Sequence, residues 1–243
     1  GQFTVEDVTR EHAGTSVTLH LRKDEDEFLE DYRLRSIISK YSDHIDLPIK
    51  MQATEEEEEG EREGNGYETV NSATALWARA KNDINEEEYQ NFYQSLSYDT
   101  EAPISTLHHK VEGNLEYTSL LYIPSKAPFD LWNREQRRGL KLYVRRVFIL
   151  DDAEQLLPSY LRFVRGIVDC ADLPLNVSRE VLQHNRQIEK IKAGVIKRVL
   201  NEIKRLAKDE PETFAAFWKE FGIVLKEGVV EDFENREAIA ELL

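Results

Sequence analysis

A run of acidic residues divides the chain and limits what can fold around it. Residues 55–63 read EEEEEGERE, with seven Glu and one Arg, and so carry a net charge of −6. Such a block repels itself and has no apolar side chain to bury, so it cannot form part of a hydrophobic core. The sequence therefore predicts a solvated acidic linker over residues 53–66, with a different domain on each side.

Composition narrows the class of protein further. The 243 residues carry a net charge of −15, which argues against nonspecific nucleic-acid binding. No run of 18 apolar residues is present, so we expect no transmembrane helix and no membrane partner. The single cysteine, Cys170, excludes an internal disulfide and a cysteine-based zinc site, and we expect a cytoplasmic protein without a bound metal. The chain starts at Gly1 with no signal-peptide pattern and no initiator Met, so we expect a piece of a longer protein.

The first 52 residues have the pattern of an incomplete domain. Val17, Leu19 and Leu21 alternate with polar residues, which predicts a half-buried strand over 14–22, with residues 3–8 as its hairpin partner. A helix follows, and its apolar residues recur at helical spacing: Leu34, Ile37, Ile38 and Tyr41. We expect an extended segment over residues 45–52. So short a stretch cannot build its own core, so it is interpreted as the end of a larger domain.

Beyond the linker the pattern is that of an α/β domain. Strands are predicted over residues 115–123 and 140–150, where β-branched and aromatic residues are frequent. Three helices are predicted: one after residue 152 with a stripe through Leu157, Leu161, Val164 and Val168, a long one over 178–208, and one that Pro211 opens and Gly222 ends.

Common catalytic motifs are absent from the sequence, including the phosphate-binding glycine loops and the zinc-protease pattern. His108 and His109 are adjacent, and neighbours on a strand point to opposite faces, so a solvated loop is favoured over a shared metal. Cys170 with His184 could serve as nucleophile and base, although a buried structural cysteine is the favoured interpretation.

Residues 172–183 (DLPLNVSREVLQ) suggest an anion site. Ser178 is a suitable helix N-cap, which places Arg179 at the first helical position, where the helix dipole disfavours a cation. A basic side chain beside unpaired backbone N–H groups suits a phosphate. Gln183 shares the helix face of Arg179, and Asn176 lies just before the cap. The alternative is an ion pair of Arg179 with Asp172 or Glu180.

The charge around this segment is positive although the chain is acidic. Residues 126–198 carry a net charge of +6, whereas the remainder carries −21. A positive face could receive a polyphosphate or an acidic partner. The alternative is a solvated sheet edge of mixed charge.

Three stretches of sequence resemble the heat-shock protein 90 chaperones, and the bacterial members in particular. They are 117–150 (YTSLLYIPSKAPFDLWNREQRRGLKLYVRRVFIL), 151–183 (DDAEQLLPSYLRFVRGIVDCADLPLNVSREVLQ) and 217–227 (FWKEFGIVLKE). The resemblance implies that residues 1–52 are the tail of an N-terminal ATP-binding domain. It also implies that residues 67–243 are most of the large part of a middle domain, an α/β/α sandwich.

The resemblance also assigns roles to individual residues. Arg179 matches an arginine that reaches the γ-phosphate of ATP, with Gln183 and Asn176 as its partners on the same loop. Thr15 matches a threonine near the adenine. The implied cofactor is ATP with Mg²⁺, held mostly by the N-terminal domain in the same chain, whose principal pocket motifs are not in this sequence.

The resemblance also implies roles for two aromatic residues and identifies the expected partners. Phe129 matches a residue that docks the middle domain on the N-terminal domain, and Trp77 one on a surface for clients or cochaperones. Either could instead serve local packing. The expected partners are client proteins and a second copy, joined through a C-terminal dimerisation domain. The function expected is that of an ATP-dependent chaperone, and the alternative is a noncatalytic module that binds clients or cochaperones.

Overall fold

The computed structural model describes residues 3–53, 66–128, 131–132, 139–151, 153, 155–175 and 185–243. The contacts within the chain divide it into two compact units, Gly1–Ser36 and Ile37–Leu243. Helix α1 (Asp31–Tyr41) crosses this division and confirms the helix predicted from the spacing of Leu34, Ile37, Ile38 and Tyr41. The two units are described separately.

The described residues of the first unit form no strand. A short 3₁₀ helix, η1 (Asp26–Leu29), precedes α1, but the predicted strand over 14–22 and its hairpin partner are not formed. Phe3, Val17 and Leu19 are 90%, 80% and 78% exposed. The prediction was wrong because alternation makes a strand only where a neighbouring strand and an apolar layer cover it. The described part of this unit offers neither.

A short hairpin joins the two ends of the acidic segment. Strands β1 (Lys50–Gln52) and β2 (Tyr67–Thr69) pair antiparallel, and the amide of Ala53 donates to the carbonyl of Gly66 at 3.0 Å. Residues 54–65 therefore connect neighbouring strands within the second unit. The domain boundary predicted at residues 53–66 stays a prediction.

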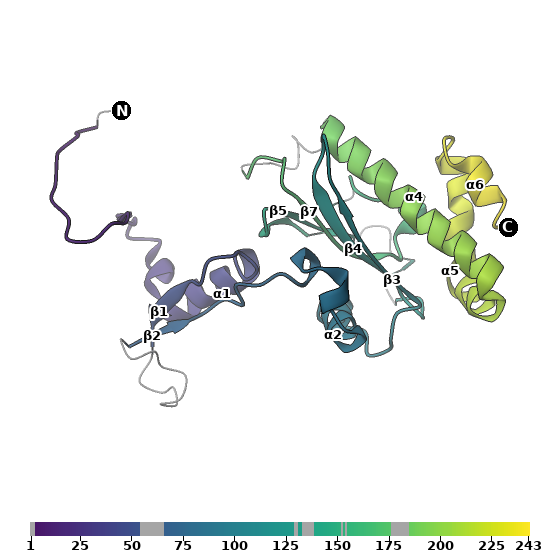
Figure 1. The fold of residues 1–243 in the computed structure, drawn as a ribbon, viewed down its shortest axis with the longest axis horizontal. Coiled ribbons are helices and arrows are strands. Elements are labelled where there is room, and N and C mark those ends of the chain that lie inside the picture. The colour runs from purple at the N-terminus through teal and green to yellow at the C-terminus, as the bar shows by residue number, and fades with distance from the viewer. Residues whose placement is uncertain are drawn as a thin grey trace. The chain divides into compact units, whose positions relative to one another are not determined.

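A five-stranded sheet forms the centre of the second unit (Figure 1). Its strands are β3 (Ser105–Val111), β4 (Tyr117–Ile123), β5 (Lys141–Val144), β6 (Val147–Leu150) and β7 (Arg165–Cys170). Their order is β3-β4-β7-β5-β6, and every pair is antiparallel except β5 with β7. The prediction of a strand over 115–123 is confirmed by β4.

Two predictions in this region were wrong. The predicted strand over 140–150 is a hairpin, because Arg145 and Arg146 turn the chain with φ angles of 50° and 66°. The predicted helix after residue 152 is the 3₁₀ helix η4 (Ser159–Leu161) followed by β7. Pro158 disfavours a helix in the residue before it. Of the apolar residues that suggested one helical stripe, Leu161 lies in η4 and Val168 in β7, while Leu157 and Val164 lie in neither element.

Helices cover both faces of the sheet (Figure 1). One face carries α4 (Arg186–Asp209), α5 (Pro211–Glu231) and α6 (Arg236–Ala240). The other carries α2 (Glu86–Ser97) with the 3₁₀ helices η2 (Leu76–Ala78) and η3 (Lys81–Asp83).

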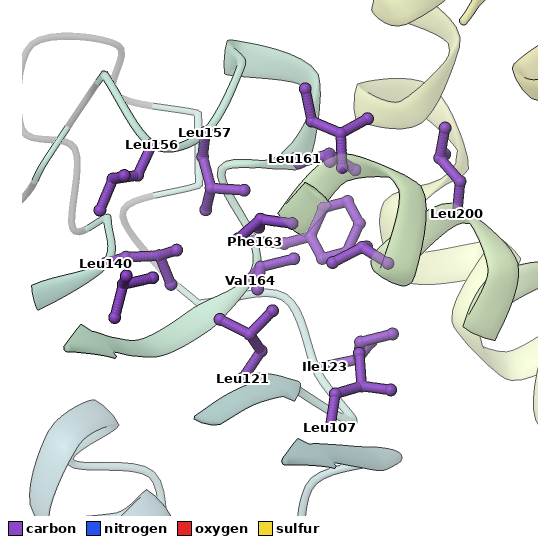
Figure 2. Packing of buried hydrophobic residues seen from close by; sticks show 14 of the residues in the cluster. Leu107, Leu121, Ile123, Leu140, Leu156, Leu157, Leu161, Phe163, Val164 and Leu200 are labelled. Atoms are coloured by element: carbon purple, nitrogen blue, oxygen red, sulfur yellow. The ribbon is translucent and has the colours of Figure 1, made fainter. Parts of the chain in front are cut away.

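The side chains of the sheet divide between these two layers. Along β4, Leu121 and Ile123 join the core beneath α4 and α5, whereas Leu120 and Tyr122 join the cluster beneath α2. Figure 2 shows the first core, in which Leu107 and Leu121 from the sheet lie near Phe163 and the helical Leu200. The expected α/β/α sandwich is confirmed.

The two long helices agree with the sequence in their apolar faces and differ at their ends. The buried stripe of α4 contains Ile188, Ile191, Val195, Val199, Ile203 and Leu206. This helix begins at Arg186, and Asn185 is its N-cap, with φ −97° and a side chain that accepts from the Gln187 amide at 2.8 Å. The helix predicted over 178–208 was wrong at its start, because Asn185 is not helical, and its residues 178–184 lie outside those that the structure describes. Helix α5 begins at Pro211 as predicted but continues through Gly222 to Glu231.

The glycines of α5 give room to neighbouring side chains. A Cβ at Gly222 would lie 2.9 Å from the Trp218 indole, and one at Gly228 would lie 2.8 Å from the Tyr160 ring and 2.7 Å from Ile239. Tyr160 and Ile239 are fully buried, whereas Trp218 is partly exposed. These glycines therefore serve packing and do not end the helix.

Replacing these glycines should have unequal effects. Gly228→Ala forces a methyl group against two buried side chains, so we expect the free energy of unfolding to fall by about 1–2 kcal/mol, despite the better helix propensity of alanine. Gly222→Ala is the matched control, because Trp218 can move outward. Urea unfolding measures both variants. Equal stabilities would contradict the proposed role of Gly228.

The paired ends of the acidic segment predict that it can be shortened. Replacing residues 54–65 by Asn-Gly keeps the Ala53–Gly66 pairing and should stabilise the chain by about 1–2 kcal/mol, since loop closure becomes less costly. Thermal melts of the shortened and original chains measure the difference. A fall in melting temperature would show that residues 54–65 contribute contacts of their own.

Candidate functional site

The structure describes only some of the residues predicted to form the site. Four of them lie outside the described residues: Phe129, Asn176, Arg179 and Gln183. Their predicted roles therefore stay predictions. Thr15 and Trp77 are described. Thr15 lies on the exposed irregular stretch of the first unit, where no described element covers it.

The described residues on both sides of the Arg179 segment are fixed to the sandwich. After β7 ends, the Asp172 carboxylate accepts from the Glu116 amide at 2.7 Å, and Leu173 is 1% exposed in the main core. On the other side, Asn185 caps α4 and Ile188 is 2% exposed. The segment that contains Arg179 thus begins and ends at anchored positions.

Trp77 lies in the interior of the second unit. Its side chain is 1% exposed, and its indole N–H donates to Asp169 Oδ2 at 2.8 Å. The ring packs against Tyr143 and Phe92, with centroid distances of 4.8 and 5.6 Å. This burial contradicts the expectation that Trp77 lies on a surface for clients, and the alternative of local packing describes its surroundings. Asp169, a carboxylate in the largely buried strand β7, was the sequence signal for this contact, and it was missed.

His108 belongs to the same cluster. Its side chain is 6% exposed, with Nε2 2.9 Å from the carbonyl oxygen of Trp77 and Nδ1 2.8 Å from the Tyr89 hydroxyl. Because a carbonyl only accepts, Nε2 carries the proton and Nδ1 accepts from Tyr89. The expectation of a solvated loop was wrong, since this histidine is a buried strand residue. Among the described residues, no group of three or more His, Cys, Asp or Glu could hold a metal.

His109 points to the opposite face of β3, as expected for its neighbour in a strand. Burial, followed by the positive charges of Arg198 and Lys81, lowers the pKa of His109 to about 4, although Glu202 acts in the opposite direction. The protonated form is therefore disfavoured in the folded chain. Burial also lowers the pKa of His108.

Stability should consequently fall as the pH is lowered from about 6.5 to about 4. In this window the unfolded chain binds protons that folded His109 does not, and the free energy of unfolding should fall by about 1–3 kcal/mol. His109→Gln should reduce this dependence, while the exposed His12→Gln should leave it unchanged. Urea unfolding at pH 7.5 and 5 measures the difference. An unchanged slope in His109→Gln would contradict the assignment.

Cys170 behaves as a core residue. It is fully buried, and burial raises the pKa of its thiol. A thiol of raised pKa is a poor nucleophile. His184, the suggested base, lies outside the described residues.

Part of the positive charge found by sequence lies inside the fold. Arg162 is 8% exposed and makes a two-fold contact with Glu227, with N–O distances of 2.6 and 3.0 Å. Arg165 is 6% exposed and donates to the carbonyl oxygen of Arg162 at 2.7 Å. Arg162 thus joins the segment before β7 to α5, and Arg165 joins the start of β7 to that segment. Both are buried, so they do not contribute to a solvent-facing positive surface.

The comparisons with known proteins agree with this architecture. Residues 61–243 match the sequence profile of the family described as Hsp90 protein. The chain is 57% identical to the chaperone protein HtpG of Hydrogenovibrio crunogenus, 58% to that of Actinobacillus succinogenes and 56% to that of Escherichia coli, over all of its length in each case. It spans 38–39% of the length of these relatives.

A solved structure has the same fold. The middle domain of a Plasmodium falciparum heat shock protein superposes with a TM-score of 0.62 at 32% identity, covering 70% of this chain and 65% of that one. The sandwich is therefore that of a chaperone middle domain. The chain belongs to the Hsp90 family. Within the described residues, no helix is long and apolar enough to cross a membrane.

Proposed function

We propose that this chain supplies a phosphate-contacting arginine, Arg179, to an ATP-dependent chaperone. In this proposal the nucleotide is bound by an N-terminal domain of the same polypeptide, and closure of that domain on the sandwich brings its γ-phosphate to Arg179. The reaction is hydrolysis of ATP to ADP and phosphate. Membership of the Hsp90 family is the observation that carries the proposal.

The chemistry required of Arg179 is electrostatic. A guanidinium group can donate two parallel hydrogen bonds to phosphate oxygens, and it stabilises the charge that develops on the transferred group. Gln183 and Asn176 would hold this group in position from the same segment. Mg²⁺ would enter with ATP, and the N-terminal domain would supply most of its surroundings, with Thr15 near the adenine.

The anchoring of the Arg179 segment supports such a role. A catalytic side chain on a loop requires a rigid scaffold, because a misplacement of about 1 Å can cost about a hundredfold in rate. The Asp172 bond to Glu116 and the Asn185 cap provide fixed ends on either side. Phe129 would complete the assembly by docking the sandwich on the nucleotide domain.

The partners in this proposal are unfolded or partly folded client proteins. A homodimer would form through a C-terminal domain outside this chain, and the protein would work in the cytoplasm. We place no nucleic acid or membrane among the partners, since the chain carries a net charge of −15.

A second candidate function is that of a noncatalytic module for clients or cochaperones. The outer face of α5 favours it, because Ile223 is 67% exposed and Lys226 lies 5.2 Å from the centre of the partly exposed Trp218 ring. Such an amphipathic surface suits protein partners. The two candidates differ in whether Arg179 affects ATP turnover.

Replacing Arg179 separates the two candidates. In the longer protein that contains this chain, Arg179→Ala should lower ATP turnover by about 10³–10⁵, or less where closure limits the rate. Arg179→Lys should not restore full turnover, since an ammonium group cannot make the two-fold contact. Steady-state phosphate release is measured beside a thermal melt.

The melt and the isolated chain supply the controls. The free energy of unfolding should change by less than about 1 kcal/mol in Arg179→Ala, as for ordinary surface residues. A large drop in the melting temperature would instead make Arg179 structural. The 243-residue chain alone should release no phosphate. Turnover by this chain that depends on Arg179 would overturn the proposal that the N-terminal domain of the longer protein is needed to bind the nucleotide.

A further inference from the structure

The residues that follow β7 lie between its two neighbouring strands. β5 and β7 are parallel, and Tyr143 lies level with Asp169, so the carboxyl ends of both strands are at the same edge of the sheet. The turn after β5 therefore lies beside Ala171, the residue that follows β7. On its other side, β7 pairs antiparallel with β4, and the start of β4 lies at this same edge.

Ala171 is bound from both of these sides. Its amide donates to the carbonyl oxygen of Glu116, just before β4, at 3.1 Å. The next residue, Asp172, accepts from the Glu116 amide at 2.7 Å. From the other side, Arg145 Nε donates to the carbonyl oxygen of Ala171 at 3.0 Å. The peptide groups on either side of the Ala171 Cα are therefore both held in place.

Arg145 makes this contact from a backbone conformation that is unfavourable for arginine. Arg145 and Arg146 form the two-residue loop of the hairpin β5–β6, with φ angles of 50° and 66°. A two-residue hairpin loop with two positive φ angles is a type I′ turn, for which Asn-Gly is the preferred sequence. The two arginines therefore carry a conformational cost that Asn-Gly would avoid. Such strain indicates that the side chains have a role of their own.

The two arginine side chains have different partners. Arg146 forms an ion pair with Asp46. Arg145 forms no ion pair with any residue that the structure describes, and its hydrogen bond goes to the Ala171 carbonyl. Arg145 and Ala171 are both exposed, and an exposed hydrogen bond contributes little to the stability of a fold. The strained Arg145 is therefore better explained by the position that it gives to Ala171.

We propose that Arg145 is a positioning residue for Arg179. Arg179 follows Ala171 by eight residues, so Arg145 and Glu116 together fix the point at which the Arg179 segment leaves the sheet. A misplacement of about 1 Å at a reacting group can cost about a hundredfold in rate, so the point of departure matters. This inference rests on the proposed function and adds to it a residue that acts without touching the nucleotide.

The first test measures the contact itself in the 243-residue chain. Arg145→Asn removes the guanidinium group, and asparagine accepts the left-handed conformation of the turn. Hydrogen exchange followed by NMR should be at least fivefold faster at the amides of Ala171 and Glu116. The Ala53 amide, which donates to Gly66, is the internal reference and should change less than twofold. Unchanged exchange at Ala171 would overturn the proposal.

A thermal melt of the same variant separates positioning from a structural role. Because Arg145→Asn relieves strain in the turn, its melting temperature should equal or exceed that of the original chain. A lower melting temperature would make Arg145 a structural residue and would overturn the proposal.

The second test measures ATP turnover in the longer protein that contains this chain. Arg145→Asn should lower kcat at least fivefold and change KM less than twofold, since Arg145 does not contact the nucleotide. Arg145→Lys keeps the strained turn and a donor for the Ala171 carbonyl, so it should recover at least half of the lost kcat. Arg179→Lys, in contrast, loses a two-fold contact. A raised KM at unchanged kcat in Arg145→Asn would overturn the positioning role.

Lys110→Asn is the matched control for the loss of a positive charge. Lys110 is exposed, pairs with Glu112, and lines the same hollow of about 270 Å³ as Arg145 and Ala171. This variant should change kcat less than twofold. A loss of kcat as large as in Arg145→Asn would show that the effect comes from the charge of the hollow, and it would overturn the assignment to the Ala171 contact.

Arg179→Ala distinguishes failure of this inference from failure of the proposed function. If Arg179→Ala lowers turnover while Arg145→Asn leaves it unchanged, the positioning role is overturned and the proposed function stands. If Arg179→Ala leaves turnover unchanged, the proposed function fails, and the positioning role of Arg145 fails with it.

Discussion

The close approach of β4 and β7 is the contact on which the sandwich depends. Gly166 has a φ of 140°, and a Cβ there would lie 2.9 Å from the Cα of Leu121, so no other residue fits between these strands. β7 also pairs with β5 on its other side, and therefore joins strands β3 and β4 to the hairpin β5–β6. Both helical layers pack on the surface that this pairing creates.

The same strand carries the chain from the core to the predicted site. Asp169 fixes the α2 face through Trp77, and Cys170 fills the opposite core. Two residues later, Asp172 is bound to the start of β4. A single strand thus determines the positions of the buried aromatic cluster and of the residue from which the Arg179 segment departs. This arrangement favours precise placement of a loop residue by a rigid strand, which the proposed contact with phosphate requires.

Much of the sandwich could be predicted from the sequence, and the errors have physical causes. The apolar stripes of α4 and α5 are long and regular, so their periodicity was sufficient. In contrast, Leu157, Leu161, Val164 and Val168 have helical spacing although Leu161 lies in η4, Val168 lies in β7 and the other two lie in neither. All four are buried, whichever element they belong to. The exposed Val17 and Leu19 show the opposite error, since alternation alone does not provide a partner strand. The site was inferred from sequence similarity, and burial then corrected the role expected for Trp77.

The hairpin β1–β2 has a consequence for the variation of this chain. Since its two strands hold Ala53 and Gly66 together, the number of residues between them does not alter the path of the polypeptide on either side. Insertions and deletions there therefore leave the positions of β1 and β2 unchanged. Evolution can change the length of the acidic segment independently of the sandwich. For the same reason, a reporter or an affinity tag can be inserted between Ala53 and Gly66.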